Sequence, residues 1–268
     1  MTPSAAEYAA REARRMRPLR FLARLGFAVN GLLHAIIGLL AIGVAASGGG
    51  EADQSGALGQ IAANPGGSII LWTVSVGLAA LGLWLIVSAF ATPPADRTKR
   101  VTHFLVAFGK GLAYLFLAGT AFTFARGGST SSESDAQSLS ATLLATPGGV
   151  FLLLLIAALV LGIGVYFVVK GVRRRFTRDI NVPAGTRGRL VVALGIWGYV
   201  SKGIALFSVG VLLIIAAVSV DPAKASGLDG ALRSLVSLPF GQLVLTGIGC
   251  GFIAYGVYSL VRARIARL

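Results

Sequence analysis

Apolar residues run along this chain in six long stretches, separated by polar and charged connections. The stretches lie at about 22–46, 68–91, 103–125, 148–171, 193–219 and 240–261. A helix needs roughly 20 apolar residues to cross the hydrocarbon core of a bilayer, and each stretch reaches that length. Backbone amides find no water to bond in lipid, so such segments must be helical. The pattern therefore predicts an all-α integral membrane protein with six transmembrane helices.

The six predicted helices form three copies of one two-helix unit. In the second helix of each copy, a glycine follows a proline by seventeen residues, and an aromatic residue follows that glycine by two: Pro65, Gly82, Trp84; Pro147, Gly164, Tyr166; Pro239, Gly256, Tyr258. The first helices share one glycine, and seven residues later a small residue: Gly31 and Gly38; Gly111 and Ala118; Gly203 and Gly210. Several matches in one register indicate a threefold internal repeat.

The repeats are predicted at 21–92, 102–176 and 193–265, after a basic N-terminal segment at 1–20. Each repeat crosses the membrane twice, so all three point the same way, as parallel repeats around an axis along the membrane normal do. We expect one compact pseudo-threefold bundle. Small residues let helix backbones approach closely in membranes, so the matched glycines and Ala118 are predicted packing positions. Each outward loop is expected to end in a short amphipathic helix, with the proline opening the returning helix.

Composition and charge agree with a membrane protein and predict its orientation. Of 268 residues, 55% are hydrophobic and 13% charged, against roughly 25% charged in soluble domains. Nineteen of the 24 basic residues lie at the two termini and in the connections between spans two and three and between spans four and five, whereas six of the ten acidic residues lie on the opposite side. Basic residues favour the cytoplasmic side, so both termini are predicted to be cytoplasmic. This orientation explains the net charge of +14 without a nucleic-acid partner.

A resemblance to a known family rests on the proline, glycine and aromatic registers. It also rests on the polar residue that stands before each shared glycine of the first helices. The chain resembles a bacterial membrane family known as domain of unknown function 1206, which has three tandem two-helix units. The resemblance covers nearly everything from about 22 to 265. It implies a fold and a compartment, the bacterial plasma (inner) membrane. No activity is established for that family, so the resemblance implies no function.

Three polar residues occupy one repeated position inside the membrane. Asn30, Lys110 and Lys202 each stand one residue before the shared glycine of a first helix, about 10–12 Å from its cytoplasmic end at 1.5 Å per residue. A charge at that depth is costly, by about 1–3 kcal/mol, and no span contains Asp or Glu. The lysines either snorkel towards the cytoplasm, bind an anion or anionic lipid head group, or serve transport. His34 lies one turn deeper than Asn30, as a packing residue or a proton-relay partner of a lysine.

No combination of residues in the sequence indicates catalysis. There is no nucleophile with a base, no metal-ligand spacing and no phosphate-binding loop, and the lone Cys250 excludes an intrachain disulfide. We expect neither an enzyme nor a cofactor or metal. The first hypothesis is a scaffold, an accessory subunit or a module that binds anionic lipids on the cytoplasmic side, with a membrane or cytoplasmic protein as a further candidate partner. The alternative is a small transporter or channel, with Asn30, Lys110 and Lys202 near the pseudo-threefold axis.

Overall fold

The chain folds almost entirely into helices. The computed structural model describes residues 5–47, 50–91 and 97–266, and within these the only extended pairing is one bridge between Ile180 and Ala266. The helices are α1 (Ala5–Ser47), α2 (Gln54–Ala62), α3 (Gly67–Ala91), α4 (Arg97–Ala125), α5 (Ser132–Leu144), α6 (Gly149–Val172), η1 (Arg175–Asp179), α7 (Gly185–Ser219), η2 (Pro222–Lys224), α8 (Gly227–Val236) and α9 (Gly241–Ile265). Six of them, α1, α3, α4, α6, α7 and α9, contain segments long and apolar enough to cross a membrane. The prediction of an all-α chain with six such helices is confirmed.

The helix ends differ from the apolar stretches where a helix continues beyond its apolar part. α7 begins at Gly185, eight residues before the predicted span, and α1 begins at Ala5. The described part of the predicted N-terminal segment, 5–20, is thus one helix with the first span, and 1–4 lie outside the described residues. Apolar residues mark the part of a helix that suits lipid. A helix that is already formed extends at little cost, so its polar ends reach further.

The same tight turn joins each short helix to the long helix that follows it. α2, α5 and α8 are the three predicted short segments, and each ends shortly before a repeat proline. The backbone N–H two residues after the proline donates to the carbonyl one residue before it, for example Gly149 N to Thr146 O at 2.9 Å. The residue after the proline has positive φ: 79° at Gly66, 78° at Gly148 and 59° at Phe240. Proline followed by positive φ makes this a type II turn.

The expectation that the prolines open the returning helices is therefore wrong by two residues. The long helices begin at the second residue after each proline, at Gly67, Gly149 and Gly241. A side chain on any of these glycines would overlap the carbonyl of the residue six positions earlier, in the preceding short helix. Proline suits the turn because its fixed φ is the one required at the second position of that turn.

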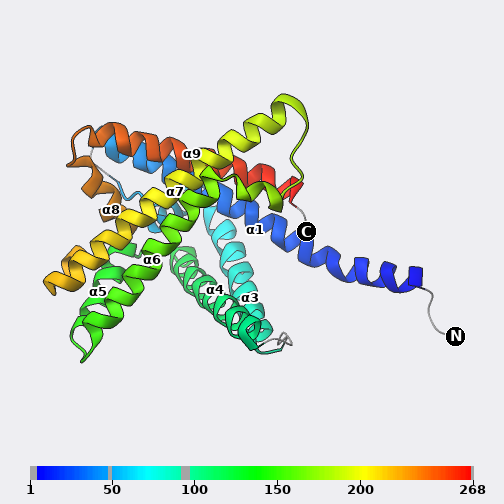
Figure 1. Cartoon of the computed structure of the whole chain (residues 1–268), viewed down its shortest axis with the longest axis horizontal. Coiled ribbons are helices and arrows are strands. Elements are labelled where there is room, and N and C mark those ends of the chain that lie inside the picture. The colour runs from blue at the N-terminus through cyan, green and yellow to red at the C-terminus, as the bar shows by residue number, and fades with distance from the viewer. Residues whose placement is uncertain (1–4, 48–49, 92–96, 267–268) are drawn as a thin grey trace. The chain divides into compact units, whose positions relative to one another are not determined.

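The structure divides into two compact units. Residues 54–135 form one unit with α2, α3 and α4, and the rest of the chain forms the other, with α1, α6, α7, α8 and α9. Within the units, the long helices pack as three intimate pairs, α1 with α9, α6 with α7 and α3 with α4 (Figure 1). In the larger unit α7 also packs against α9. Each intimate pair joins the second helix of one repeat to the first helix of another: first to second, second to third, and third to first.

The repeat-matched glycines lie where the backbones of these pairs approach closely. A Cβ on Gly31 would lie 2.7 Å from the Gly256 carbonyl oxygen, and a Cβ on Gly203 would lie 2.7 Å from that of Gly164. The corresponding distance between Gly111 and Gly82 is 2.9 Å in either direction. Real Cβ atoms do not approach so closely, so these backbones touch only because glycine stands at both positions.

The packing positions seven residues further along are also in contact. A Cβ on Gly38 would lie 2.8 Å from Cγ1 of Ile253, and one on Gly210 would lie 2.6 Å from Cγ of Leu161. In the remaining pair, α3 with α4, the Ala118 carbonyl accepts a hydrogen bond of 2.9 Å from the Ser75 hydroxyl. Each pair thus makes two contacts, two helical turns apart, along one face of the helix.

Polar contacts of the short outer helices follow the same order of repeats. Ser55, Gln137 and Asp229 each stand ten residues before a repeat proline. Ser55 Oγ accepts from the Ser132 amide at 3.0 Å, Gln137 Nε2 donates to the Ala223 carbonyl at 3.3 Å, and Asp229 Oδ1 accepts from the Ala52 amide at 2.7 Å. These contacts again join the first repeat to the second, the second to the third, and the third to the first. The arrangement of all three repeats as one pseudo-threefold bundle, and the side of the termini, stay predictions.

Candidate functional site

Lys202 lies where four long helices of the larger unit meet. It belongs to α7, and its ammonium lies over two aromatic rings, Phe167 of α6 at 5.3 Å and Tyr255 of α9 at 4.8 Å from the ring centroids. Its Nζ is also 3.1 Å from Nε2 of His34 on α1. Aromatic faces attract cations more strongly when both are desolvated. The charge is therefore held by two rings and an imidazole rather than by a carboxylate.

His34 connects this lysine to the backbone of α1. Its side chain is buried, and its Nδ1 lies 2.8 Å from the Asn30 carbonyl oxygen, one turn earlier. A carbonyl only accepts hydrogen bonds, so Nδ1 carries the proton, and in the neutral ring Nε2 accepts from the lysine. The ring also packs against Tyr255, at 4.7 Å between centroids. These contacts fix both the orientation and the tautomer of the histidine.

The side chain of Asn30 contacts its partner helix, α9, at the repeat position that is equivalent to the one Lys202 contacts on α6. Asn30 Nδ2 donates to the Ser259 hydroxyl at 3.4 Å. Ser259 stands three residues after Gly256, and Phe167 stands three residues after Gly164. The repeated position thus faces the equivalent residue in two helix pairs, with an amide on a hydroxyl in one and an ammonium on a ring in the other.

Lys110 has a different environment. It lies on α4 in the smaller unit, and its side chain is exposed. Of the four polar residues selected from the sequence, the structure brings Asn30, His34 and Lys202 into one cluster, and Lys110 belongs to the other unit.

A second polar cluster lies towards the ends of α6 and α9 that carry the arginines. Asp179 of η1 is 3.0 Å from Nζ of Lys170 and 3.7 Å from Nη2 of Arg262. Arg262 Nη1 donates to the Tyr199 hydroxyl at 3.3 Å, and its guanidinium lies over the Phe27 ring at 4.4 Å. One carboxylate therefore ties the connection between α6 and α7 to the last turns of α6 and α9.

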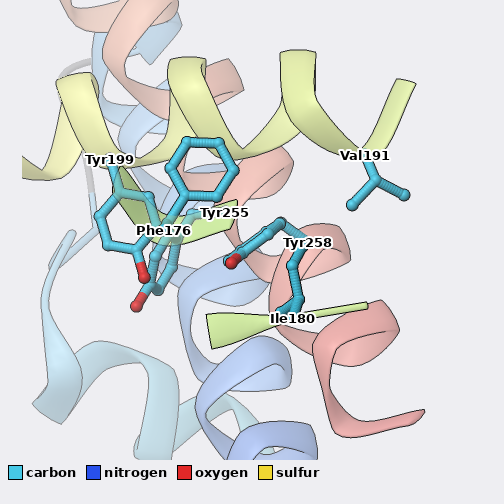
Figure 2. Close-up of a cluster of buried hydrophobic side chains, with 6 residues drawn as sticks. All are labelled: Phe176, Ile180, Val191, Tyr199, Tyr255 and Tyr258. Carbon is cyan, nitrogen blue, oxygen red and sulfur yellow. The ribbon is translucent and has the colours of Figure 1, made fainter. Parts of the chain in front are cut away.

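Aromatic rings pack beside this cluster, and Tyr199 contacts both Lys170 and Arg262. Figure 2 shows Phe176 among Tyr199, Tyr255 and Tyr258. Phe176 is fully buried, stacks on Tyr199 with centroids 5.3 Å apart, and meets Tyr258 edge to face at 5.3 Å. Gly195 leaves room for it, since a Cβ there would overlap the Phe176 ring. The connection is therefore anchored by a buried ring as well as by charge.

Sequence reasoning missed this second cluster, although two signals for it were present. Asp179 is the only acidic residue between α6 and α7, among many cations. Lys170 and Arg262 each stand six residues after a matched glycine, Gly164 and Gly256, so the repeat register already made them equivalent. Phe176 carries no such signal, because no aromatic residue stands at the equivalent position of either other repeat.

A groove of about 480 Å³ lies beside the same connection. Arg174 and Arg189 line it, and its other walls are mostly apolar: Val182, Pro183, Gly185, Gly188, Val192, Ala193 and Ile196. Both arginine side chains are exposed. Such a surface suits a ligand that is anionic at one end and apolar at the other. Within the described part of the chain, no group of three His, Cys, Asp or Glu residues is placed to hold a metal ion.

The chain matches a known family over three successive segments. A family model described as Domain of Unknown Function (DUF1206) matches residues 25–92, 105–174 and 197–266. The chain belongs to the DUF1206 family. The three matches confirm the resemblance and the tandem repeat that the sequence predicted.

A relative of the chain adds no activity. The chain is 29% identical over 243 residues to "Uncharacterized protein YxxB" of Bacillus subtilis (strain 168). The alignment covers 89% of this chain and 88% of that protein. No solved structure matches the chain.

Proposed function

We propose that this DUF1206 protein is a non-catalytic multi-pass protein of the bacterial plasma membrane that binds anionic lipids at its cytoplasmic face and acts as a scaffold or accessory subunit. The observation that carries the proposal is a cationic rim on the larger unit, around the end of α6, the start of α7 and the end of α9. The rim consists of exposed arginines: Arg173, Arg174, Arg175, Arg178, Arg187, Arg189 and Arg264.

The rim has little internal neutralisation. Asp179 is the carboxylate of this region, and Lys170 and Arg262 already engage it. Basic clusters immediately next to transmembrane helices attract anionic lipids, by about 1 kcal/mol for each Lys or Arg near the surface. A rim of seven arginines therefore favours an anionic leaflet strongly.

The charge distribution supports a cytoplasmic rim. Basic residues concentrate in cytoplasmic loops, and the rim lies mainly on the connection that holds more of them than any other. The opposite connections contain Asp221, Asp229 and few cations. We propose on this basis that both termini are cytoplasmic. Parallel repeats, with equivalent glycine contacts in each pair, support the pseudo-threefold arrangement of this proposal.

Purification of the protein with native lipid, followed by mass spectrometry of what is retained, tests the proposal. We expect phosphatidylglycerol to be enriched several-fold over zwitterionic lipid, with the enrichment falling as ionic strength rises. Retention of neither anionic lipid nor a partner protein would contradict it.

Proton transport is a second candidate, favoured by one observation, the 3.1 Å contact between Lys202 and His34. Both side chains exchange protons, and they lie inside helices that cross the membrane. The test is proton flux into liposomes that contain the protein, followed with an internal pH-sensitive dye. Lys202→Ala should abolish protein-dependent flux, whereas Lys110→Ala, on an exposed lysine, should leave it unchanged. Equal flux through wild type and Lys202→Ala rejects this candidate.

A further inference from the structure

The groove beside α7 combines two arginines with apolar walls at one end of a membrane-crossing helix. We propose that it binds the head group of one anionic phospholipid, with the phosphate at Arg174 and Arg189 and the glycerol and upper acyl chain along Val192 and Ile196. This inference rests on the proposed function, because it requires that the rim face a lipid surface. It adds a defined site, with two named arginines, to a general attraction.

The arginines supply the recognition of phosphate. A guanidinium is planar, always charged, and offers paired N–H donors that match two phosphate oxygens. Arg174 and Arg189 come from different segments of the chain, one just after the end of α6 and the other from the first turns of α7. A phosphate bound by both would receive donors from two separate segments of the chain.

The backbone holds Arg174 in an unusual conformation. Its φ of 52° and ψ of 26° lie in the left-handed region, which non-glycine residues avoid. Hydrogen bonds hold it on both sides, since its amide donates to the Gly171 carbonyl at 3.0 Å and its carbonyl accepts from the Thr177 amide at 3.1 Å. Strained conformations that the surroundings enforce cluster at binding sites.

The start of α7, which also lines the groove, is fixed by a close backbone contact. A side chain at Gly188 would overlap the Pro183 carbonyl, so the first turn of α7 lies directly against the Val182–Pro183 segment. This contact needs glycine at position 188, and it sets the position of the next residue, Arg189. The groove is thus formed by backbone contacts before any ligand arrives.

The apolar walls favour a lipid over a soluble phosphate compound. Val192 and Ile196 are one turn apart on α7, and Leu190 and Trp197 on the same helix are exposed. Exposed apolar side chains on a membrane-crossing helix face acyl chains, and tryptophan is enriched at the membrane interface. A head group in the groove would therefore place its own acyl chain against this apolar surface.

The test compares two double variants with the same change in charge. Arg174→Gln/Arg189→Gln removes both groove cations, and the control Arg173→Gln/Arg178→Gln removes two exposed rim arginines that do not line the groove. Full-length proteins are placed in bilayer discs of equal phosphatidylglycerol and phosphatidylcholine, extracted into detergent, and weighed by native mass spectrometry. We expect the groove variant to retain about tenfold less phosphatidylglycerol, and the control to stay within twofold of wild type.

The possible outcomes separate the groove from the rim. Equal losses in both double variants would overturn the groove and leave the proposed function standing. No preference for phosphatidylglycerol in the wild type would overturn both. Displacement of the lipid by millimolar glycerol phosphate would identify a soluble occupant and also overturn the inference.

A third variant keeps the groove testable if the glutamine double variant does not fold. Arg174→Lys/Arg189→Lys keeps the charge and loses the paired donors. We expect it to lose several-fold in retained phosphatidylglycerol while its thermal unfolding stays at the wild-type temperature. Wild-type retention by this variant would show that geometry is irrelevant and would overturn the site.

Discussion

At the scale of single residues, Lys202 shows how a charge is accommodated between helices without a carboxylate. Two ring faces and the lone pair of a neutral imidazole surround its ammonium. Such a charge-assisted bond contributes more than a bond between neutral groups, and the partner left behind after its loss is buried and unsatisfied. The pair should therefore be strongly coupled in stability.

A double-mutant cycle at these two residues measures that coupling. His34→Leu should destabilise the protein by about 2 kcal/mol, because the ammonium loses its acceptor. Lys202→Met should cost less after His34→Leu than in the wild type, with a coupling of about 1–2 kcal/mol. The measurement is the unfolding free energy in mixed micelles with rising denaturing detergent. Additive effects of the two substitutions would contradict the contact.

At the equivalent position of the three type II turns, introducing a side chain and removing one should change stability in opposite directions. Gly66→Ala and Gly148→Ala should each lower stability by about 1 kcal/mol, the typical penalty for a side chain in the left-handed region. Phe240→Gly should raise it by about as much, since Phe240 already pays that penalty at φ 59°. Thermal unfolding of the three variants checks this, and a destabilised Phe240→Gly would show that the exposed ring anchors the turn.

The sequence predicted the positions of the polar residues within the long helices better than it predicted the side chains that contact them. The register placed Asn30, Lys110 and Lys202 in equivalence, and helical spacing placed His34 near Asn30. It did not predict that Lys202 meets Phe167 and Tyr255, because side chains on separate helices carry no common signal in one sequence. It also could not separate Lys202 from Lys110, since their difference arises from neighbouring helices.

At the scale of helices, the glycine contacts set which faces pair. The contact between Gly164 and Gly203 brings two backbones together at a distance that no Cβ tolerates. The neighbouring Gly162 on the same helix has open space around its Cβ position. The two glycines of α6 therefore form a matched pair for mutation.

Gly164→Ala should destabilise the protein by about 1–3 kcal/mol, because overpacking forces the helices apart. Gly162→Ala should be neutral or stabilising by about 0.5–1 kcal/mol, because alanine is the better helix former. The same contrast is expected on α9 between Gly256→Ala and Gly247→Ala. Unfolding in detergent measures all four, and equal effects of Gly162→Ala and Gly164→Ala would falsify the close approach.

The register of small residues predicted the faces but not the partners. Both helices of a repeat carry a matched glycine, so the pattern fits pairing within a repeat as well as pairing with the next one. The structure pairs α3 with α4, α6 with α7 and α9 with α1. The pattern also did not predict the full lengths of α1 and α7, because only the apolar parts of these helices repeat.

At the scale of the whole molecule, orientation is the property on which the lipid proposals depend. The rim arginines and the outer loops carry opposite charge, and this asymmetry predicts their sides. Arg178 on the rim and Lys224 on the outer side are both exposed, and each is suitable for a reactive label.

Single cysteines at these positions test the orientation, in a background with Cys250→Ser. Arg178→Cys should react with a membrane-impermeant maleimide only in inside-out vesicles, and Lys224→Cys only in intact cells. The Cys250→Ser background alone supplies the control for unspecific labelling. Labelling of Arg178→Cys in intact cells would reverse the orientation and remove the basis of the cytoplasmic lipid site.

The close pairing of helices from different repeats has a consequence for how such a chain arose. A single repeat possesses both glycine surfaces, one on each helix, yet the intimate contact is made with a neighbour's helix. A protein of one repeat would reproduce the contacts seen here only by associating with further copies of itself. Joining the copies in one polypeptide lets each of them differ, and here an asparagine, an exposed lysine and an enclosed lysine occupy one repeated position.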